Sequence, residues 1–192
     1  MLTNPVLEAI RERRSTRVFE NKPVPSEVLE AILEAAVWAP NGSNRQNWKF
    51  TAIASPGKMQ LLNEAAREAC RTYVADDDYP PKKHLEHAGN NPDYVFTTAP
   101  VLIITSNEPN YPNATADCTA ALQNMFLAAQ SLGLGSCYIN APHWLEGNTA
   151  LREFLLTLGI PKEYTICGSA AIGYIGKATA ATPRKKDTVQ IF

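Results

Sequence analysis

A continuous apolar run, Val-Leu-Ile-Ile-Thr at residues 101–105, lies near the middle of the 192-residue chain between Pro100 and a polar loop. A short run without alternating polar positions is typical of a strand that is buried on both faces. Such a strand needs a covering layer on each side, and amphipathic helical patterns precede and follow it. We therefore expect a sheet covered by helices, with helices and strands interspersed along the chain.

The hydrophobic pattern also predicts the order of the elements. After Ser26, apolar pairs recur every four residues as far as Val37, which indicates a helix with a wide buried stripe that ends before Pro40. The other expected elements are a short helix from Pro5, a loop over 40–47, a strand over 48–54, a helix capped by Ser55-Pro56, a helix over 115–132 that ends at Gly133, a strand over 137–139, a helix over 148–158 and a strand over 165–172.

Two further expectations concern the middle of the chain. Residues 76–98 are rich in proline, asparagine and aspartate, and we expect an irregular excursion there with a helical turn. In the helix that follows Ser55-Pro56, the residues expected to face inward are Leu61, Leu62, Ala65, Ala66 and Ala69.

Composition excludes several classes of protein. The chain has 18 Lys and Arg against 19 Asp and Glu, a balance that argues against a dedicated partner of nucleic acid or of a membrane surface. No stretch approaches the ~20 apolar residues that span a bilayer, and the N-terminus lacks the apolar core of a signal peptide. The four cysteines are dispersed without a C-x-x-C pair, so we expect buried thiols in a reducing cytoplasm.

Several catalytic motifs are absent. The glycine-rich stretch 133–138 lacks the third glycine of a dinucleotide fingerprint, and it follows a helix and precedes a strand, the reverse of the required order. There is no Walker A sequence and no G-x-S-x-G elbow. His84 and His87 are three residues apart, but no convincing third ligand lies near them, so we expect no metal site.

Three polar segments remain as candidates for a binding site. Arg13, Arg14 and Arg17 cluster with Ser15 at the end of the first helix. Arginine forks suit a phosphate group, although such a cluster alone is more often a solvated basic turn. The amide-rich loop 41–46 suits the edge of a flat heterocycle, and residues 184–186 form a second basic group.

Taken together and in this order, the segments resemble the nitroreductase family from end to end. The resemblance rests on the following motifs: R-R-S-T-R-x-F from Arg13 to Phe19, A-P-N-G-S-N-R-Q-N-W from Ala39 to Trp48, A-A-x-x-L-G-L-G-S-C from Ala128 to Cys137, G-Y-I-G from Gly173 to Gly176, and P-R-K in the tail. The first two motifs are specific in combination, whereas the glycine turn and the tail are weak singly.

The resemblance implies an α+β fold, a three-layer sandwich with a mixed central sheet flanked by helices, in an intertwined homodimer with FMN between the subunits. It also implies one domain over 1–192, whose tail from about 177 contributes to the cofactor site or the dimer. The implied roles are as follows: Arg13, Arg14 and Ser15 hold the phosphate and ribityl chain; Arg17 approaches the pyrimidine edge; Pro40, Asn41 and Gly42 of the partner line the ring, supported by Asn44 and Gln46; Ile139-Asn140 lie near the reactive nitrogen; and Arg184, or Lys185, completes the phosphate site.

The residue types suit hydride transfer. This chemistry needs a donor and a flavin held about 3–3.5 Å apart and no general base, so we expect the flavin and not a catalytic side chain to carry it. The resemblance implies NAD(P)H as reductant and nitroaromatics or quinones as acceptors. Two departures concern the site. Asn47 stands where many relatives have proline, and the stretch from Asn107 to Thr115 is too short for a lid helix.

Three alternatives stay open at this point. The first is another flavin reaction on the same scaffold, because the family includes flavin-fragmenting, dehalogenating and dipeptide-oxidising enzymes. The second is an FMN-binding module with little turnover. The third, a small dehydrogenase without flavin, is disfavoured by the missing dinucleotide fingerprint.

Overall fold

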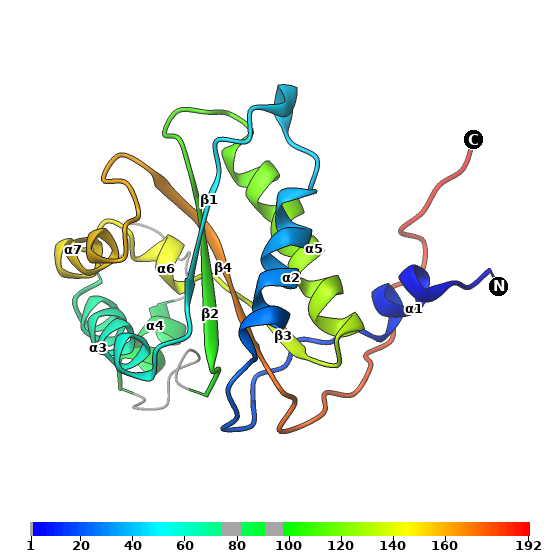
Figure 1. Ribbon diagram of the computed structural model, residues 1–192, viewed down its shortest axis with the longest axis horizontal. Coiled ribbons are helices and arrows are strands. Elements are labelled where there is room, and N and C mark those ends of the chain that lie inside the picture. Colours follow the sequence, from blue (N-terminus) through cyan, green and yellow to red (C-terminus); the bar gives the residue numbers. More distant parts are fainter. Residues whose placement is uncertain (1, 74–81, 91–97) are drawn as a thin grey trace.

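The structure is a computed structural model that describes residues 2–73, 82–90 and 98–192, with the side chains of the second range from Leu85 onward. Figure 1 shows a sheet in the middle with helices on either side. In chain order the elements are α1 Pro5–Glu12, α2 Ser26–Val37, the short 3-10 helix η1 Gly42–Asn44, β1 Lys49–Ile53, α3 Pro56–Thr72, α4 Lys82–Asn90, β2 Val101–Asn107, α5 Ala114–Ser131, β3 Gly135–Ile139, α6 Ala141–Trp144, α7 Thr149–Thr157 and β4 Thr165–Gly173.

The described strands form one sheet in the order β1-β2-β4-β3. All neighbouring strands run antiparallel, and the register shifts between Thr105 and Ser106, where β2 faces β4. Among the described residues the sheet is therefore antiparallel, and the expectation of a mixed sheet is wrong. In the part of the chain that the structure describes, the one parallel pairing is an isolated bridge between Ser15 and Ser136, because the segment after α1 meets β3 without extending into a strand.

Strand β2 shows why the fold has three layers. Val101 and Ile103 pack in one buried cluster with α2 and α5, whereas Leu102 and Ile104 pack in another with α3 and α7. Successive side chains of a strand point to opposite faces, so an entirely apolar strand must be covered twice. All seven residues of β2 are buried, which confirms the expected central strand.

Local signals set several helix ends. Asn4 caps α1 by accepting the Leu7 N–H at 2.9 Å, and Asn148 caps α7 by accepting the Leu151 N–H at 3.0 Å. Gly133 follows α5 with a φ of 74°, a conformation that glycine adopts without steric cost. The backbone N–H of Leu134 closes this end on the Ala129 carbonyl at 2.8 Å.

Some expectations differ from the structure. Leu61 was expected inside, but it is 53% exposed because the buried stripe of α3 passes through the neighbouring Leu62. Val37, at the end of the expected stripe of α2, is also half-exposed. The helical turn expected within residues 76–98 is the nine-residue helix α4, while 76–81 and 91–97 lie outside the described residues. The short helix α6 after β3 had no distinct sequence signal.

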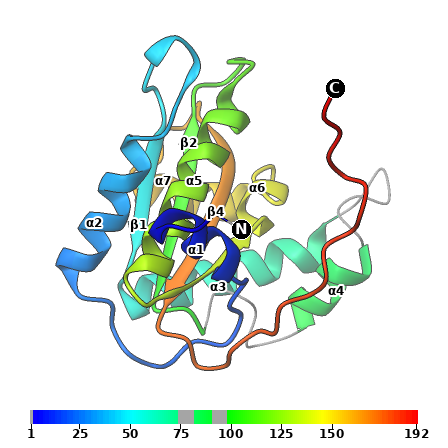
Figure 2. The same ribbon diagram turned by 90° about the vertical axis from the view of Figure 1, so that its right-hand side faces the viewer.

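A segment after α1 and the segment after β4 meet beside the sheet (Figure 2). An antiparallel bridge joins Phe19 to Ile175, and the Gly176 N–H donates to the Val18 carbonyl at 3.0 Å. Beyond this point the tail extends away from the sheet, and its side chains are exposed. No described helix is long and apolar enough to cross a membrane.

Candidate functional site

The arginine segment 13–17 lies along the outer edge of β3. The backbone N–H of Thr16 donates to the Ser136 carbonyl at 2.9 Å, and Thr16 is buried. Gly135 permits this approach, because a Cβ there would lie 2.4 Å from Thr16 Oγ1. On the other side, the Thr179 hydroxyl donates to the Ser15 carbonyl at 3.1 Å. Strand β3 and the start of the tail therefore both hold the segment.

Three predicted side chains of this segment influence the Cys137 thiol of β3. Burial raises the pKa of the Cys137 thiol, while the guanidinium groups of Arg17 and Arg13 and the Ser15 hydroxyl act in the opposite direction. The segment thus brings two cations and a hydroxyl to the open edge of the sheet, beside β3.

The guanidinium groups differ in what they already bind. Arg13 lies over the Phe126 ring of α5 at 5.8 Å from the ring centroid, a cation–π contact. Arg14 turns back on α1, where its Nη1 donates to the Arg11 carbonyl at 2.5 Å and to the Arg13 carbonyl at 2.7 Å. Arg17 is exposed and joined to the body through its carbonyl, which accepts the Thr98 hydroxyl at 3.2 Å.

The second predicted group, loop 40–47, is held partly by its own amides. Asn41 Oδ1 accepts the Gln46 N–H at 3.0 Å, and Asn44 Oδ1 accepts from Gln46 Nε2 at 3.0 Å. Ser43, Asn44 and Gln46 have φ values of 55°, 53° and 53°, a left-handed backbone that few non-glycine residues adopt. Pro40 is exposed at the start of the loop.

The turn between β2 and α5 and the first turn of α5 hold the same loop from outside. Gly42 N–H donates to the Asp117 carboxylate at 3.1 and 3.2 Å. Arg45 and Asn47 both donate to Glu108, at 3.0 and 2.6 Å. Asn47 therefore tethers the loop through its side chain. No helix occupies 108–113, which confirms the expected absence of a lid helix in this stretch.

A single chain does not bring these two groups together. Loop 40–47 contacts α5 at Asp117 and the arginine segment contacts it at Phe126. At a rise of 1.5 Å per residue, these positions are about 14 Å apart along the helix. Figure 1 shows the loop beyond one end of α5 and α1 beside the lower half of that helix.

The remaining predicted residues lie on the β3 edge and in the tail. Ile139 is buried, and its carbonyl accepts the Ser169 hydroxyl at 2.7 Å. Asn140 follows it and begins α6, where its carbonyl accepts the His143 N–H at 2.9 Å. Arg184 and Lys185 are exposed, and no contact within the described part of the chain joins them to the arginine segment.

Comparison with known proteins decides the family. The family model described as "Nitroreductase family" matches residues 10–174. The chain belongs to the nitroreductase family. A nitroreductase from Bacteroides fragilis with bound FMN is 39% identical with a TM-score of 0.90, and the match covers 99% of this chain and 100% of that chain.

Two curated relatives have names that describe an activity. A protein of Archaeoglobus fulgidus, named as an NADH dehydrogenase/NAD(P)H nitroreductase, is 28% identical over 88% of this chain and 84% of its own length. A 4-nitrobenzoate reductase from Nocardioides sp. is 28% identical over 91% of this chain and 83% of that protein. The family and the α+β sandwich expected from the sequence are confirmed.

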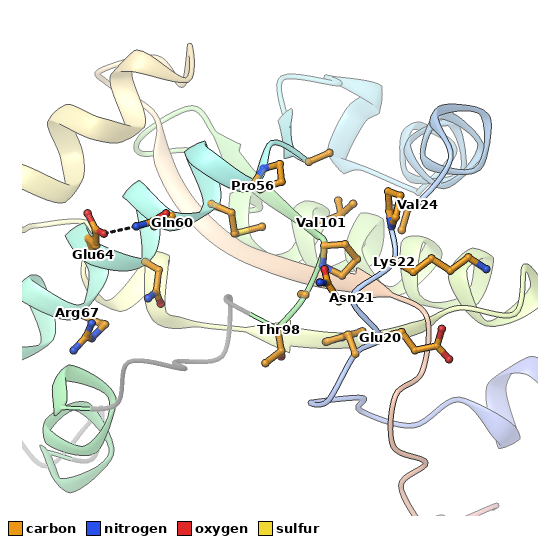
Figure 3. A pocket seen from close by; sticks show the side chains of 17 residues that line it. Glu20, Asn21, Lys22, Val24, Pro56, Gln60, Glu64, Arg67, Thr98 and Val101 are labelled. Carbon is orange, nitrogen blue, oxygen red and sulfur yellow. Dashed lines mark hydrogen bonds between the residues drawn. The ribbon is translucent and has the colours of Figure 1, made fainter.

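A large cavity lies elsewhere in this nitroreductase-family chain. It has a volume of about 830 Å³ and is lined by residues 19–24, by one side of α3 and by residues 98–101. Figure 3 shows Gln60 and Glu64 at its wall, joined by a hydrogen bond of 3.0 Å. None of the residues predicted to bind the cofactor lines this cavity. Within the described residues, no group of three metal-ligating side chains is present.

Sequence reasoning missed two residues that shape the site. Asp117 lies on the buried stripe of α5, beside Cys118 and one turn before Ala121, and an acid at such a position is a readable signal. Tyr111 lies in the short turn before α5, where nothing in the sequence distinguishes it from a surface tyrosine.

Proposed function

We propose that this chain is an FMN-dependent oxidoreductase that passes hydride from NAD(P)H to nitroaromatic, quinone or similar acceptors. The observation that carries the proposal is the arginine segment 13–17, which backbone pairing holds against the outer edge of β3. The FMN-bound Bacteroides fragilis nitroreductase and the relatives named for NAD(P)H and nitro compounds support it.

The donors of this segment fit a phosphate group. Phosphate of FMN is close to doubly negative, and guanidinium forks and hydroxyls are its usual ligands. Arg13 and Ser15 would hold the phosphate and ribityl chain, with Arg14 as a further donor. Because Arg14 already bonds two carbonyls at the end of α1, it would contribute fewer free N–H groups than Arg13.

The other edge contacts follow from the geometry of β3. Ser136 turns its carbonyl to the outer edge, where it meets Thr16. Along a strand, the backbone N–H and C=O groups of successive residues point alternately to the two edges. Asn140 lies four residues after Ser136, so its N–H would point to the same outer edge. The N–H of Ile139 would point to the opposite side, toward β4. We place the Asn140 N–H at the reactive nitrogen of the flavin, and Arg17 at the pyrimidine edge.

FMN when bound would supply the hydride-accepting and hydride-donating chemistry. The chain would orient the ring and favour its reduced form. Arg17 would place a fixed positive charge where the reduced ring is negative. No general base is required, so the site needs no catalytic side chain.

A homodimer would complete the site. Loop 40–46 is too far along α5 to reach the arginines of its own chain, and we propose that it lines the flavin of the partner. Exposed apolar side chains in the single chain support a second copy as the missing surface. They include Val6 and Ile10 of α1, Trp38 after α2, and Val189, Ile191 and Phe192 of the tail.

We also propose that residues 1–192 act as one unit whose tail reaches the cofactor site or the partner. The tail begins beside Ser15 and then leaves its own body, and it carries Arg184 and Lys185 outward. We place the enzyme in the cytoplasm, where NAD(P)H is available and the four free cysteines stay reduced.

The test is the visible absorption spectrum of the freshly purified protein before and after anaerobic addition of NADH and of NADPH. A bound-flavin spectrum that bleaches with either nicotinamide and recovers on addition of 4-nitrobenzoate or a quinone is expected. A yellow protein that neither nicotinamide reduces would instead be a binding module, and a colourless one that takes up no added FMN would contradict the proposal.

A further inference from the structure

Asp117 is a carboxylate buried under the cofactor-lining loop. It is 7% exposed, on the same inward stripe of α5 as Cys118 and Ala121. A buried carboxylate is costly unless hydrogen bonds satisfy it. Here the Gly42 N–H lies 3.1 and 3.2 Å from its two oxygens, and the Tyr111 hydroxyl donates at 3.0 Å.

These contacts hold Gly42 from both sides of its backbone. Asp117 accepts its N–H, and the Tyr111 hydroxyl lies 3.2 Å from its carbonyl oxygen, so that the Gly42 carbonyl and the Asp117 carboxylate share the single Tyr111 proton. A Cβ at Gly42 would lie 2.3 Å from that hydroxyl and 2.5 Å from Asn113 Nδ2, so the approach requires glycine. Arg45 lies over the Tyr111 ring at 4.6 Å and so joins the loop to the same tyrosine.

The loop needs such a support. Three of its residues have positive φ values and are not glycine, and each such residue stores backbone strain that surrounding structure must offset. The amide bonds among Asn41, Asn44 and Gln46 are within the loop itself. The bonds from Asp117 and Tyr111 to Gly42, together with those from Glu108, fix it to the rest of the chain.

We propose that Asp117 is a positioning residue that sets the conformation of loop 40–46, and that it acts on the flavin of the partner subunit. This inference rests on the proposed function, in which the loop lines that flavin. Asp117 would not touch the cofactor. Its carboxylate would hold the Gly42 peptide, and the peptide would set where Pro40 and Asn41 meet the ring.

The first test measures FMN binding to the apoprotein by quenching of flavin fluorescence. Asp117→Ala removes both acceptors, and we expect the Kd to rise by about tenfold. Tyr111→Phe keeps the ring under Arg45 and should give a smaller rise. Asp117→Asn retains one oxygen that can accept the Gly42 N–H and should recover much of the affinity. Glu153→Gln, an exposed carboxylate on α7, is the matched control and should change nothing.

The second test uses mixed dimers with two affinity tags. In the proposed arrangement, each site combines the arginines of one chain with loop 40–46 of the other. A dimer of one Asp117→Ala chain and one Arg17→Ala chain then has one site with neither defect, so one FMN should bind with wild-type affinity. In a dimer of one wild-type chain and one chain with both substitutions, each site has one defect, and neither should reach wild-type affinity. A purely structural role for Asp117 would not produce this difference.

The outcomes separate the two claims. If the wild type binds no FMN, the proposed function fails. If the wild type binds FMN and a folded Asp117→Ala or Tyr111→Phe protein binds equally well, only the role of Asp117 is overturned. If the mixed dimers give the reverse pattern, the loop serves the flavin of its own chain, and the action across the dimer is wrong.

Discussion

Thr16 donates its backbone N–H to the Ser136 carbonyl at 2.9 Å, and this bond joins the arginine segment to β3. The two residues are far apart in sequence, and the contact depends on the missing side chain of Gly135. A rigid sheet edge therefore positions the guanidinium groups, which a free N-terminal arm would leave mobile.

Gly135→Ala should disturb this junction. The added methyl would lie 2.4–2.8 Å from three atoms of the buried Thr16 side chain, so the segment must shift. We expect a loss of about 1–3 kcal/mol in the free energy of unfolding, together with weaker FMN binding. Urea denaturation and an FMN titration check both effects. Gly147→Ala, where nothing lies within 4 Å of the added Cβ, is the control and should be near neutral.

Arg17→Ala should lower both FMN affinity and the midpoint potential of the bound flavin. A guanidinium at the pyrimidine edge stabilises the anionic reduced ring, and its removal favours the oxidised form. We expect affinity to fall by roughly tenfold. The potential is measured by equilibration with a reference dye. Arg71→Ala, which removes a surface arginine paired with Glu68 on α3, should leave both values unchanged; an unchanged potential in Arg17→Ala would contradict its placement.

The basic tail offers a test of register. Arg184, Lys185 and Lys186 are exposed neighbours, and we propose that one of the first two completes the phosphate site of FMN. Arg184→Ala or Lys185→Ala should weaken FMN binding. The affinity of that variant for FMN should also depend less on salt concentration than the affinity of the wild type does. Lys186→Ala serves as the neighbour control. If all three single variants bind FMN with the affinity of the wild type, the tail is not part of the phosphate site.

Buried thiols should make the protein sensitive to alkaline pH. Burial raises the pKa of Cys70 from 9.0 to about 11. A raised folded-state pKa adds stability that is fully present below pH 9 and is lost as the pH rises toward 11, since the unfolded thiol ionises first. The difference in stability between the wild type and Cys70→Ala should therefore shrink over this range. Denaturation curves at pH 8, 9.5 and 11 measure this difference. If it stays constant over that range, burial does not raise the pKa of Cys70.

Local features of the fold could be predicted from the sequence. The caps at Asn4 and Gly133 depend on neighbouring residues, and the apolar run of β2 requires burial on both faces wherever the strand lies. Leu61 was misassigned because adjacent leucines leave the phase of a helix stripe ambiguous by one residue. The antiparallel order of the strands depends on pairings between distant segments, which no local pattern encodes.

The candidate site shows the same limit. Arg13, Arg17 and Ser15 follow from a motif, but the pairing of their segment with β3 is a tertiary contact. The role of Asp117 could have been suspected from its position on a buried stripe, whereas its partner Tyr111 could not. Motifs named the candidate binding residues, and only the structure showed what holds them.

The most direct test of the central claim compares FMN with riboflavin, which lacks the phosphate, in the wild type and in Arg13→Ala. If the arginine segment on β3 binds the phosphate, the wild type should prefer FMN by at least about tenfold, and Arg13→Ala should lose most of that preference while its affinity for riboflavin stays the same. An equal preference for FMN in both proteins would show that the phosphate binds elsewhere.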